Sequence, residues 1–306
     1  MRPTSSRVIG IDAGATKTAA VAETLEGEAV ERLRTGPSAI VGLPDARALA
    51  VLRDIVDRLA PQREALAHVT IGLSGVDFPE EQPEQHRRVA EAIGVPKDRL
   101  LLVNDSLVAL AGAATVDRAT LVQHGTEVTM AWRPRLGEES VFDSVGIADC
   151  FDLRLRTAPL VARMLDGRAP VTPLKDLVLA HCGVDAEAFP RWVIRDPGAK
   201  DRILKIGPVV FGAWQDGDPA AAQLVEAAVE DYVTATVAMA ARLGPGAFQA
   251  CFGGGTINQG GAALLSAIED RLSGRRPDAK LSPPAASPED GALFLARRAA
   301  SLAAVR

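Results

Sequence analysis

The stretch RVIGIDAGATKTAAV, residues 7–21, decides the fold. Val8, Ile9 and Ile11 form a short apolar strand, and the small or β-branched residues 19–21 can return beside it as an antiparallel partner. The polar and glycine-containing residues between them have the composition of a turn. The stretch therefore predicts a β-hairpin close to the N-terminus, with its turn directly after the apolar strand.

The predicted turn combines a carboxylate with small and hydroxyl-bearing residues, namely Asp12, Gly14, Thr16 and Lys17. Glycine lets backbone N–H groups approach phosphate oxygens, and threonine hydroxyls add donors. A carboxylate at a strand end can hold a hydrated Mg²⁺. The stretch matches neither the Walker loop nor the G-x-G-x-x-G pattern, and an ordinary turn uses the same residue types. A metal-bound polyphosphate site and a plain turn therefore both stay open.

The composition is that of a soluble globular protein. The 306 residues suffice for two domains with substantial cores, and 47% hydrophobic and 24% charged residues are ordinary values. A net charge of −5 gives no support to nucleic acid or an anionic membrane as a partner. The N-terminus lacks the apolar core of a signal peptide, and no apolar run reaches membrane-spanning length. We expect a cytoplasmic protein with no nucleic-acid or membrane partner.

The cysteines Cys150, Cys182 and Cys251 lie far apart and show no C-x-x-C spacing. This pattern argues against a zinc site and against a disulfide framework, and it suits a reducing compartment. We expect buried, unreactive thiols.

The first part of the chain alternates strands with helices. Asp45 is expected to cap the first helix, Gly94 to close the second and Ser106 to cap the third. This order predicts an α/β layer with a mostly parallel sheet. The predicted elements are a helix at 43–59, a strand at 69–73, a helix ending at residue 93, a strand at 100–103 and a helix at 107–114.

Polar residues follow three of the predicted strands. Asp12 ends the first, Ser74 follows the second, and Asn104 with Asp105 follows the third. Ligands of parallel sheets gather at the carboxyl ends of the strands, although each of these residues can also cap a helix. Together they predict a binding site at that edge of the sheet.

A second hairpin opens the rest of the chain, with strands at 120–122 and 128–132 around a turn that contains Gly125 and Thr126. Two α/β halves of similar pattern suggest a duplicated domain with a cleft between the copies. Small ligands often bind in clefts between domains. The predicted elements that follow are helices at 154–165, 174–180, 201–215 and 220–243, a strand at 248–252, a helix ending at residue 272, a connector at 277–288 and a helix at 291–304. Asp218 is expected to cap the fourth of these helices and Gly244 to end it.

Seven motifs, taken in order, resemble the BadF/BadG/BcrA/BcrD ATPase family of the sugar kinase, Hsp70 and actin superfamily, which includes N-acetylglucosamine kinases. The resemblance implies two similar ribonuclease H-like (actin-like ATPase) α/β domains, residues 1–115 and 116–306, with a nucleotide cleft between them. In this division of the chain, the final helix, 290–304, can pack against the first domain although it follows the second. The motifs are IDAGATKT (11–18), GLSGVD (72–77), LLVNDSLVALAGA (101–113), Gly125-Thr126, LDGRAP (165–170), AWQDGDPAA (213–221) and CFGGGT (251–256).

The same resemblance implies roles for the site residues in transfer from ATP and Mg²⁺ to an acceptor hydroxyl. Asp105 matches the general base, and Asp12 matches the residue that positions the metal. Ser74 and Asn104, at the neighbouring strand ends, are expected to contact the acceptor. The expected nucleotide-binding residues are Gly14, Thr16 and Lys17 in a first phosphate loop, Gly125 and Thr126 in a second, and Gly253, Gly254 and Gly255 in an adenosine loop.

The chain departs from the family pattern in three places. Ala39 stands where sugar kinases usually carry Asn, Glu127 stands where a second glycine is expected, and residues 145–149 replace a G-D-E-G-S segment. One hypothesis is an ATP-dependent kinase for a sugar, amino sugar or polyol with a divergent acceptor site. The alternative is a catalytically degenerate member that binds nucleotide or sugar and acts as a sensor or partner protein. Because the family often forms homodimers, we expect a homodimer.

Overall fold

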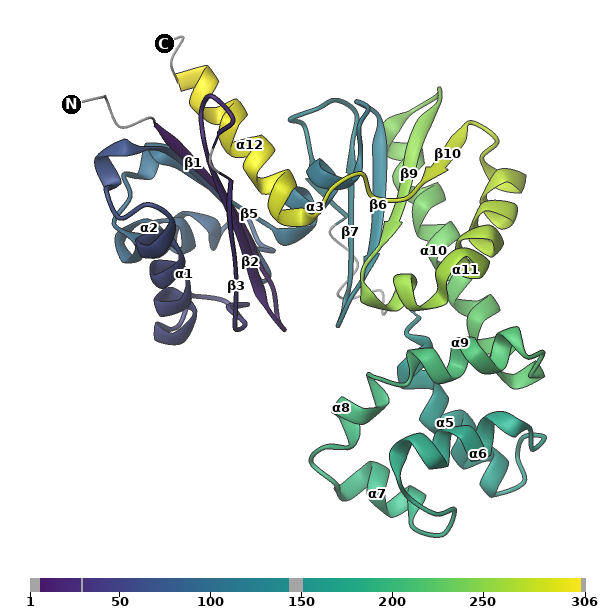
Figure 1. Ribbon diagram of the computed structural model, residues 1–306. Coiled ribbons are helices and arrows are strands. Elements are labelled where there is room, and N and C mark those ends of the chain that lie inside the picture. Colours follow the sequence, from purple (N-terminus) through teal and green to yellow (C-terminus); the bar gives the residue numbers. More distant parts are fainter. Residues whose placement is uncertain (1–5, 29, 143–150, 304–306) are drawn as a thin grey trace.

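Two five-stranded sheets organise the computed structural model, which describes residues 6–28, 30–142 and 151–303 (Figure 1). The first sheet has the order β3-β2-β1-β4-β5. β1 pairs antiparallel with β2 and parallel with β4, so the predicted hairpin provides the centre of this sheet. The strands are β1 (Arg7–Ala13), β2 (Thr18–Thr24), β3 (Glu31–Thr35), β4 (Leu66–Leu73) and β5 (Leu100–Val103).

The second sheet, of order β10-β9-β6-β7-β8, repeats the arrangement of the first. β6 pairs antiparallel with β7 and parallel with β9, as β1 does with β2 and β4. The repeated order agrees with the duplicated α/β pattern predicted from the two hairpins. The strands are β6 (Ala119–His124), β7 (Val128–Arg133), β8 (Ser140–Val141), β9 (Phe248–Gly253) and β10 (Ala279–Ser282).

The helices cover the sheets and form a separate bundle below the second sheet in Figure 1. Beside the first sheet lie α1 (Ala46–Leu59) and α2 (Gln82–Ile93), and between the sheets lie α3 (Asp105–Ala113) and α12 (Pro288–Ala303). α10 (Pro219–Leu243) and α11 (Gly255–Arg275) pack beside the second sheet. The bundle contains α5 (Leu153–Leu165), α6 (Pro173–Cys182), α7 (Phe189–Arg195), α8 (Ala199–Ile203) and α9 (Gly207–Gln215).

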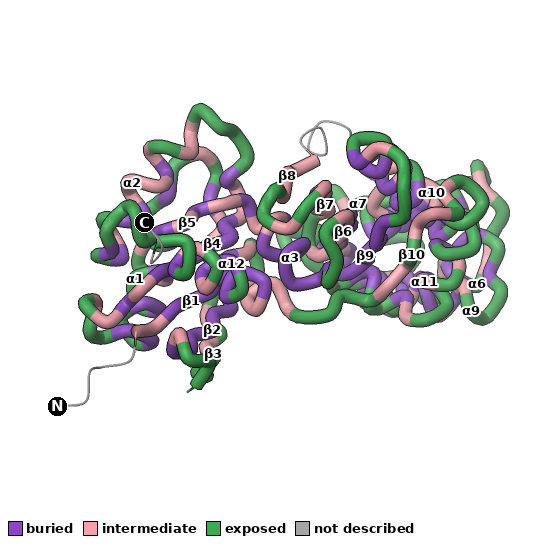
Figure 2. The backbone as a smooth tube through the Cα atoms, turned by 90° about the horizontal axis from the view of Figure 1, so that it is seen from above, coloured by how far each residue is buried: buried purple, intermediate pink, exposed green. Residues whose placement is uncertain are grey.

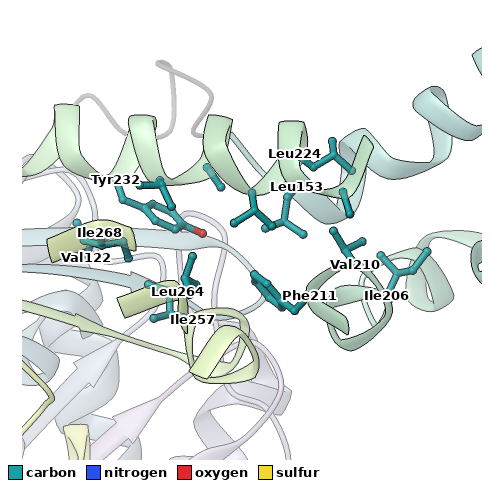
Figure 3. Close-up of a cluster of buried hydrophobic side chains, with 14 of the residues drawn as sticks. Val122, Leu153, Ile206, Val210, Phe211, Leu224, Tyr232, Ile257, Leu264 and Ile268 are labelled. Atoms are coloured by element: carbon teal, nitrogen blue, oxygen red, sulfur yellow. The ribbon is translucent and has the colours of Figure 1, made fainter. Parts of the chain in front are cut away.

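Each lobe has its own apolar core. In the first, Ile9 and Ile11 of β1 pack with Leu52 of α1 and Val89 of α2. The second core joins the sheet to the helices around it, as Figure 3 shows for Tyr232 beside Val122. Burial of each large aliphatic side chain contributes about 1.5–3 kcal/mol, so these cores hold the strand ends in place.

Local capping signals were mostly sufficient to find the helix ends. The Asp45 side chain accepts a hydrogen bond from the Ala48 amide, and Asp218 caps α10, so both predictions are confirmed. The prediction for Ser106 is wrong, because Asn104 caps α3 and Ser106 lies inside the helix. The Asn104 side-chain oxygen accepts from the Ser106 amide and takes the role assigned to the serine.

The predicted helix at 201–215 is wrong, since the chain forms α8 and α9 with a break between them. Pro208 lies in the first turn of α9, where a missing N–H is harmless. In a continuous helix its ring would clash with the carbonyl of residue 204 and remove a hydrogen bond. The predicted connector at 277–288 also contains β10, and the prediction missed β3 and α7.

Two further predictions from the sequence concern the cysteines and membrane-spanning helices. Cys182 and Cys251 are free and buried, as predicted, whereas Cys150 lies outside the described residues. Burial raises the pKa of the Cys251 thiol to about 11, which keeps the thiol protonated. No helix in the described part of the chain has the length and apolar character needed to cross a membrane.

The C-terminal helix α12 packs on the first sheet and on α3 (Figures 1 and 2). Its contact with β1 is between backbones, because a Cβ built on Gly10 would lie 2.1 Å from the Leu293 nitrogen. Its contact with α3 is equally close, since a Cβ on Gly291 would lie 2.0 Å from the Val108 carbonyl oxygen. Glycine is therefore required at both crossings.

We predict that Gly10→Ala will destabilise the protein. The added methyl group has no space below α12, and overpacking of this kind typically costs about 1–3 kcal/mol. Urea unfolding followed by circular dichroism measures the loss. Gly274→Ala is the matched control, because no atom lies within 4 Å of its added Cβ and alanine favours the exposed helix. A Gly10→Ala variant as stable as the parent would contradict the close packing of α12 on β1.

Candidate functional site

One cavity of about 750 Å³ collects the carboxylates and glycine-containing turns from both sheets. Asn104 is the one predicted site residue that does not line it. Asp12 and the glycines at 253–255 lie in the same cavity although they belong to different sheets. The predicted residues that line it are Asp12, Gly14, Thr16, Lys17, Ser74, Asp105, Gly125, Thr126, Gly253, Gly254 and Gly255.

The first turn, residues 14–17, joins β1 to β2. The Gly14 amide donates to the Lys17 carbonyl at 3.0 Å, which closes the turn. The Gly14 carbonyl accepts from the Ser38 and Ala39 amides, each at 3.2 Å. Because carbonyl and N–H of a trans peptide point in opposite directions, the Ala15 amide faces away from residues 38 and 39.

The second turn, residues 125–127, joins β6 to β7. The Gly125 amide donates to the Glu127 carbonyl at 3.0 Å. Arg154 of α5 donates to the carbonyls of Gly125 at 2.8 Å and Thr126 at 2.9 Å. The turn is therefore held by a side chain from a different element.

The third turn follows β9 and leads into α11. Gly254 has φ +91°, and a Cβ there would lie 2.5 Å from the His124 carbonyl oxygen. Both the backbone conformation and the close approach to β6 require glycine. Thr256 Oγ1 donates to the Gly125 carbonyl at 3.1 Å and ties this turn to the second one.

Asp12 stands at the end of β1 and is 9% exposed. Burial, followed by the charges of Asp105 and Glu289, raises its pKa to about 7, although Lys17 partly opposes the shift. The folded protein therefore holds a carboxylate that is poorly solvated and lies near other negative charges. A cation beside Asp12 would stabilise the ionised carboxylate and lower its pKa.

Asp105 is the first residue of α3. Burial and the nearby Asp77 raise its pKa to about 6, while backbone N–H groups at the start of the helix lower it in part. Glu127 makes a smaller contribution in the upward direction, which means that its charge reaches Asp105 across the cavity. A carboxyl group with a pKa near 6 is ionised at neutral pH and is still basic enough to accept a proton.

The donor set around the cavity suits magnesium better than a metal held by protein ligands alone. Within the described ranges, no three or more His, Cys, Asp or Glu residues are grouped to hold a metal ion. Mg²⁺ commonly uses one or two carboxylates and completes its shell with water and substrate phosphates. Asp12, with Asp105 near it, fits that pattern.

The sequence model of the BadF/BadG/BcrA/BcrD ATPase family matches residues 9–296, nearly the whole chain. The protein belongs to this family.

Several proteins that this chain resembles are described as sugar kinases. The N-acetylmuramic acid/N-acetylglucosamine kinase of Clostridium acetobutylicum is 24% identical over 236 residues, which are 73% of this chain and 76% of that protein. The structure of a candidate N-acetylglucosamine kinase from Chromobacterium violaceum superposes with a TM-score of 0.70 at 25% identity, over 96% of this chain and 100% of that one. A ROK family glucokinase from Streptomyces griseus, solved with glucose and AMPPNP, gives 0.59 at 18% identity, over 97% and 99%. The chain thus has the two-lobed, actin-like fold of these kinases.

The three departures from the BadF/BadG/BcrA/BcrD pattern lie in different surroundings. Glu127 is exposed and lines the cavity. Ala39 does not line it, but its amide holds the first turn through Gly14. Residues 145–149 lie outside the described part of the chain.

Asn104 is engaged within the protein. Its amide nitrogen donates to Asp77 at 2.7 Å, and its side-chain oxygen accepts from the Ser106 amide and hydroxyl. These bonds fix the start of α3 and hence Asp105. A contact between Asn104 and the acceptor stays a prediction.

The sequence did not reveal Arg154, Asp152 or His124 as site residues. Arg154 lines the cavity and is 4% exposed, and it lies within hydrogen-bond distance of the other two. The Asp-Leu-Arg spacing signals at most a helix start. The contact with the second turn links residues 28 and 29 positions apart and has no local signature.

We predict that Asp12→Asn will stabilise the protein at pH 8 when nucleotide and divalent cations are absent. The pKa of Asp12 is about 7 in the folded state and about 4 in an unfolded chain. The folded state therefore binds more protons between these values, and the stability of the parent falls as the pH rises from about 4 to about 7. Asparagine removes this penalty, for a gain on the order of 2–4 kcal/mol.

Urea unfolding at pH 4 and pH 8 tests this expectation. The gain should be large at pH 8 and small at pH 4, where Asp12 is protonated in the folded state and about half protonated in the unfolded chain. Asp201→Asn, on the exposed surface of α8, should change stability little at either pH. An Asp12→Asn gain of equal size at both pH values would contradict the raised pKa.

Proposed function

We propose that the protein is an ATP-dependent kinase that transfers the γ-phosphate to a hydroxyl group of a sugar, amino sugar or polyol. The observation that carries this proposal is the meeting of Asp12, Asp105 and all three glycine-containing turns in one cavity. The kinase activities named for the relatives from Clostridium acetobutylicum and Chromobacterium violaceum support it.

The three turns would bind ATP. The amides of Ala15, Thr126 and Glu127, together with Lys17, suit the phosphates, and the flat backbone of residues 253–255 suits the adenosine. Residues 1–115 and 116–306 act as two domains that enclose ATP and acceptor. Phosphoryl transfer depends mostly on positioning and charge neutralisation, so a site built from backbone donors is adequate for it.

Asp12 would hold the magnesium ion. When bound, Mg²⁺ would supply positive charge that neutralises the phosphates during transfer. The raised pKa of Asp12 has the same physical origin, because burial and neighbouring carboxylates leave its negative charge short of a partner. Lys17 supplies part of the required positive charge.

Asp105 would act as the general base. One of its oxygens accepts the proton of the acceptor hydroxyl while the hydroxyl oxygen forms a bond to the γ-phosphorus. The bond from the γ-phosphorus to the oxygen bridging the β-phosphate breaks, and ADP leaves with the electron pair. A pKa of about 6 allows the carboxylate to be ionised at neutral pH before transfer. Ser74, in the same cavity, is available to contact the acceptor.

The direct test is ADP formation from Mg²⁺-ATP across a panel of sugars, amino sugars and cyclitols. Acceptor-dependent ADP formation is expected with at least one of them. Glu127 favours a second function, because its carboxylate lines the cavity where phosphates would lie. Binding of nucleotide or sugar without ADP formation would indicate a degenerate member that acts as a sensor or partner protein.

We predict that Asp105→Asn will slow turnover by about 10²–10⁴-fold while it changes ATP affinity little. The amide cannot accept the acceptor proton, but it leaves the nucleotide-binding turns intact. Asp12→Asn provides the contrast and should instead raise the Mg²⁺-ATP concentration needed for activity. Steady-state kinetics with both substrates varied, beside calorimetric titration of ATP, separates the two effects. Equal turnover by Asp105→Asn and the parent would remove Asp105 from the mechanism.

We predict that Glu127→Gly will bind Mg²⁺-ATP more tightly than the parent. Two like charges about 5 Å apart at an effective dielectric constant of about 20 repel by roughly 3 kcal/mol. Because the side chain is exposed, water screens this repulsion, and we expect about 1 kcal/mol, or roughly a fivefold change in affinity.

Calorimetric titration of ATP decides the question, with Glu127→Gln as the control that removes charge and keeps size. Both variants should gain affinity. Unchanged affinity in both would contradict the repulsion argument. Weaker binding by both would identify Glu127 as a metal ligand and would strengthen the assignment as a kinase.

A further inference from the structure

A buried guanidinium at the wall of the cavity supports the second turn. Arg154 Nη1 donates to the Gly125 carbonyl at 2.8 Å, and Nη2 donates to the Thr126 carbonyl at 2.9 Å. The residue is 4% exposed, so these bonds form away from bulk water. Two consecutive carbonyls are therefore drawn toward one cation.

Asp152 holds the other edge of the Arg154 guanidinium. Nε and Nη2 of Arg154 bind the two oxygens of Asp152 at 2.9 and 2.6 Å, and the same carboxylate caps α5. The charge of Arg154 is therefore already balanced within the protein. This fork-to-carboxylate geometry is specific to arginine, because a lysine ammonium cannot present two parallel N–H bonds.

His124 completes the support. Its Nε2 lies 3.0 Å from Arg154 Nη2, and its Nδ1 faces the Tyr232 hydroxyl. Arg154 Nη2 carries two N–H groups, which face the Thr126 carbonyl and one oxygen of Asp152, and His124 Nε2 also lies 3.5 Å from that Asp152 oxygen. The imidazole therefore packs against the Arg154–Asp152 pair directly beside the turn. The side chain of His124 is fully buried at the end of β6, directly before the turn.

The direction of the carbonyls determines the direction of the amides. All peptide bonds in the described residues are trans, so the N–H of each peptide points opposite to its carbonyl. With the carbonyls of Gly125 and Thr126 facing Arg154, the N–H groups of Thr126 and Glu127 face the other way. Both residues line the cavity, and neither amide donates to a protein group in the described part of the chain. Successive free amides of this kind make an anion site.

In the first turn, a carbonyl is also held on the side away from the cavity amide, but its partners are backbone amides and not a side chain. There the Gly14 carbonyl is held by the Ser38 and Ala39 amides, which leaves the Ala15 amide on the opposite side. Among the described residues, no backbone amide donates to the Gly125 carbonyl, and the second turn uses the Arg154 side chain. Thr256 contributes one further bond to the Gly125 carbonyl.

We propose that Arg154 is a positioning residue for phosphate binding: it fixes the turn at residues 125–127 so that two backbone amides face the phosphates of a nucleotide. This inference rests on the proposed kinase function. Arg154 acts through the turn and not by its charge, which Asp152 balances. Without Arg154, the Thr126 carbonyl loses its side-chain partner and the Gly125 carbonyl retains the Thr256 hydroxyl, so the peptide between residues 126 and 127 is free to rotate its negative end toward the phosphates.

The experiment compares three probes by calorimetric titration, namely Mg²⁺-ATP, inorganic tripolyphosphate and adenosine. Arg154→Met should bind Mg²⁺-ATP and tripolyphosphate at least tenfold more weakly and adenosine within twofold of the parent. Arg154→Lys keeps the positive charge beside Asp152 but cannot hold both carbonyls. It should also lose at least fivefold in ATP affinity, whereas a direct charge contact would largely survive this change.

Arg133→Met is the matched control. Arg133 is fully buried in β7 and donates to the carbonyls of Ala114, Val116 and Asp117, away from the cavity. This variant should lose stability without any change in the ratio of ATP to adenosine affinity. If it does not fold, Arg118→Met, which removes bonds to carbonyls after α10, serves the same purpose.

The outcomes separate the two proposals. A parent protein that binds none of the three probes would overturn the proposed function. A parent that binds Mg²⁺-ATP, with Arg154→Lys and Arg154→Met binding it equally well, would overturn the role of Arg154 and leave the kinase assignment intact. Equal losses of ATP and adenosine affinity would reduce Arg154 to a structural residue. If Arg154→Met does not fold, the ratio measured for Arg154→Lys decides.

Discussion

The backbone contact of α12 with β1 and α3 is the constraint on which the site depends. The glycines Gly10, Gly112 and Gly291 let three elements meet without side chains between them. The same crossing brings the amides of Ala285 and Ala286 to the carbonyls at the end of α3, at 3.0 and 2.9 Å. These bonds satisfy carbonyls that a helix end leaves unpaired. The C-terminal segment thereby joins the first sheet to the second and lines the cavity between them.

The cavity combines two kinds of polar group that differ in their effect on the stability of the folded protein. The turn amides are donors whose carbonyls are paired elsewhere, so they remain available at little cost in stability. Asp12 and Asp105 are costly, because burial and neighbouring carboxylates raise both pKa values. Charged groups of this kind destabilise a folded protein until a ligand of opposite charge arrives. The arrangement therefore places the unfavourable energy where a magnesium-bound phosphate would relieve it.

The parts of the fold that were predictable carry local signals. The β1–β2 hairpin follows from apolar spacing, and the starts of α1 and α10 follow from Asp45 and Asp218, whose side chains cap the next turn. Five of the seven motifs, at 11–18, 72–77, 101–113, 125–126 and 251–256, contribute residues to the cavity. The break before α9 was also readable from Pro208, which lies in the first turn of that helix.

The remaining features depend on contacts between distant residues. β10 is a four-residue edge strand whose pattern alone does not distinguish it from a loop, and its pairing with β9 makes it a strand. The position of α12 requires Gly10 and Gly291 to meet, which are far apart in the chain. The contact of Arg154 with the second turn likewise arises only when the start of α5 meets the turn between β6 and β7. Such contacts cannot be found from periodicity or capping.

The contacts of Arg154 with the second turn indicate what the replacement of a glycine by Glu127 changes. A glycine in a phosphate-binding turn commonly serves to let the backbone adopt the required orientation. Here the orientation of the peptides is set by Arg154, which holds the carbonyls of Gly125 and Thr126. The amide of Glu127 therefore faces the cavity regardless of its side chain. The replacement leaves the backbone donors in place and adds one negative charge, so it changes the electrostatics of the site and not its geometry.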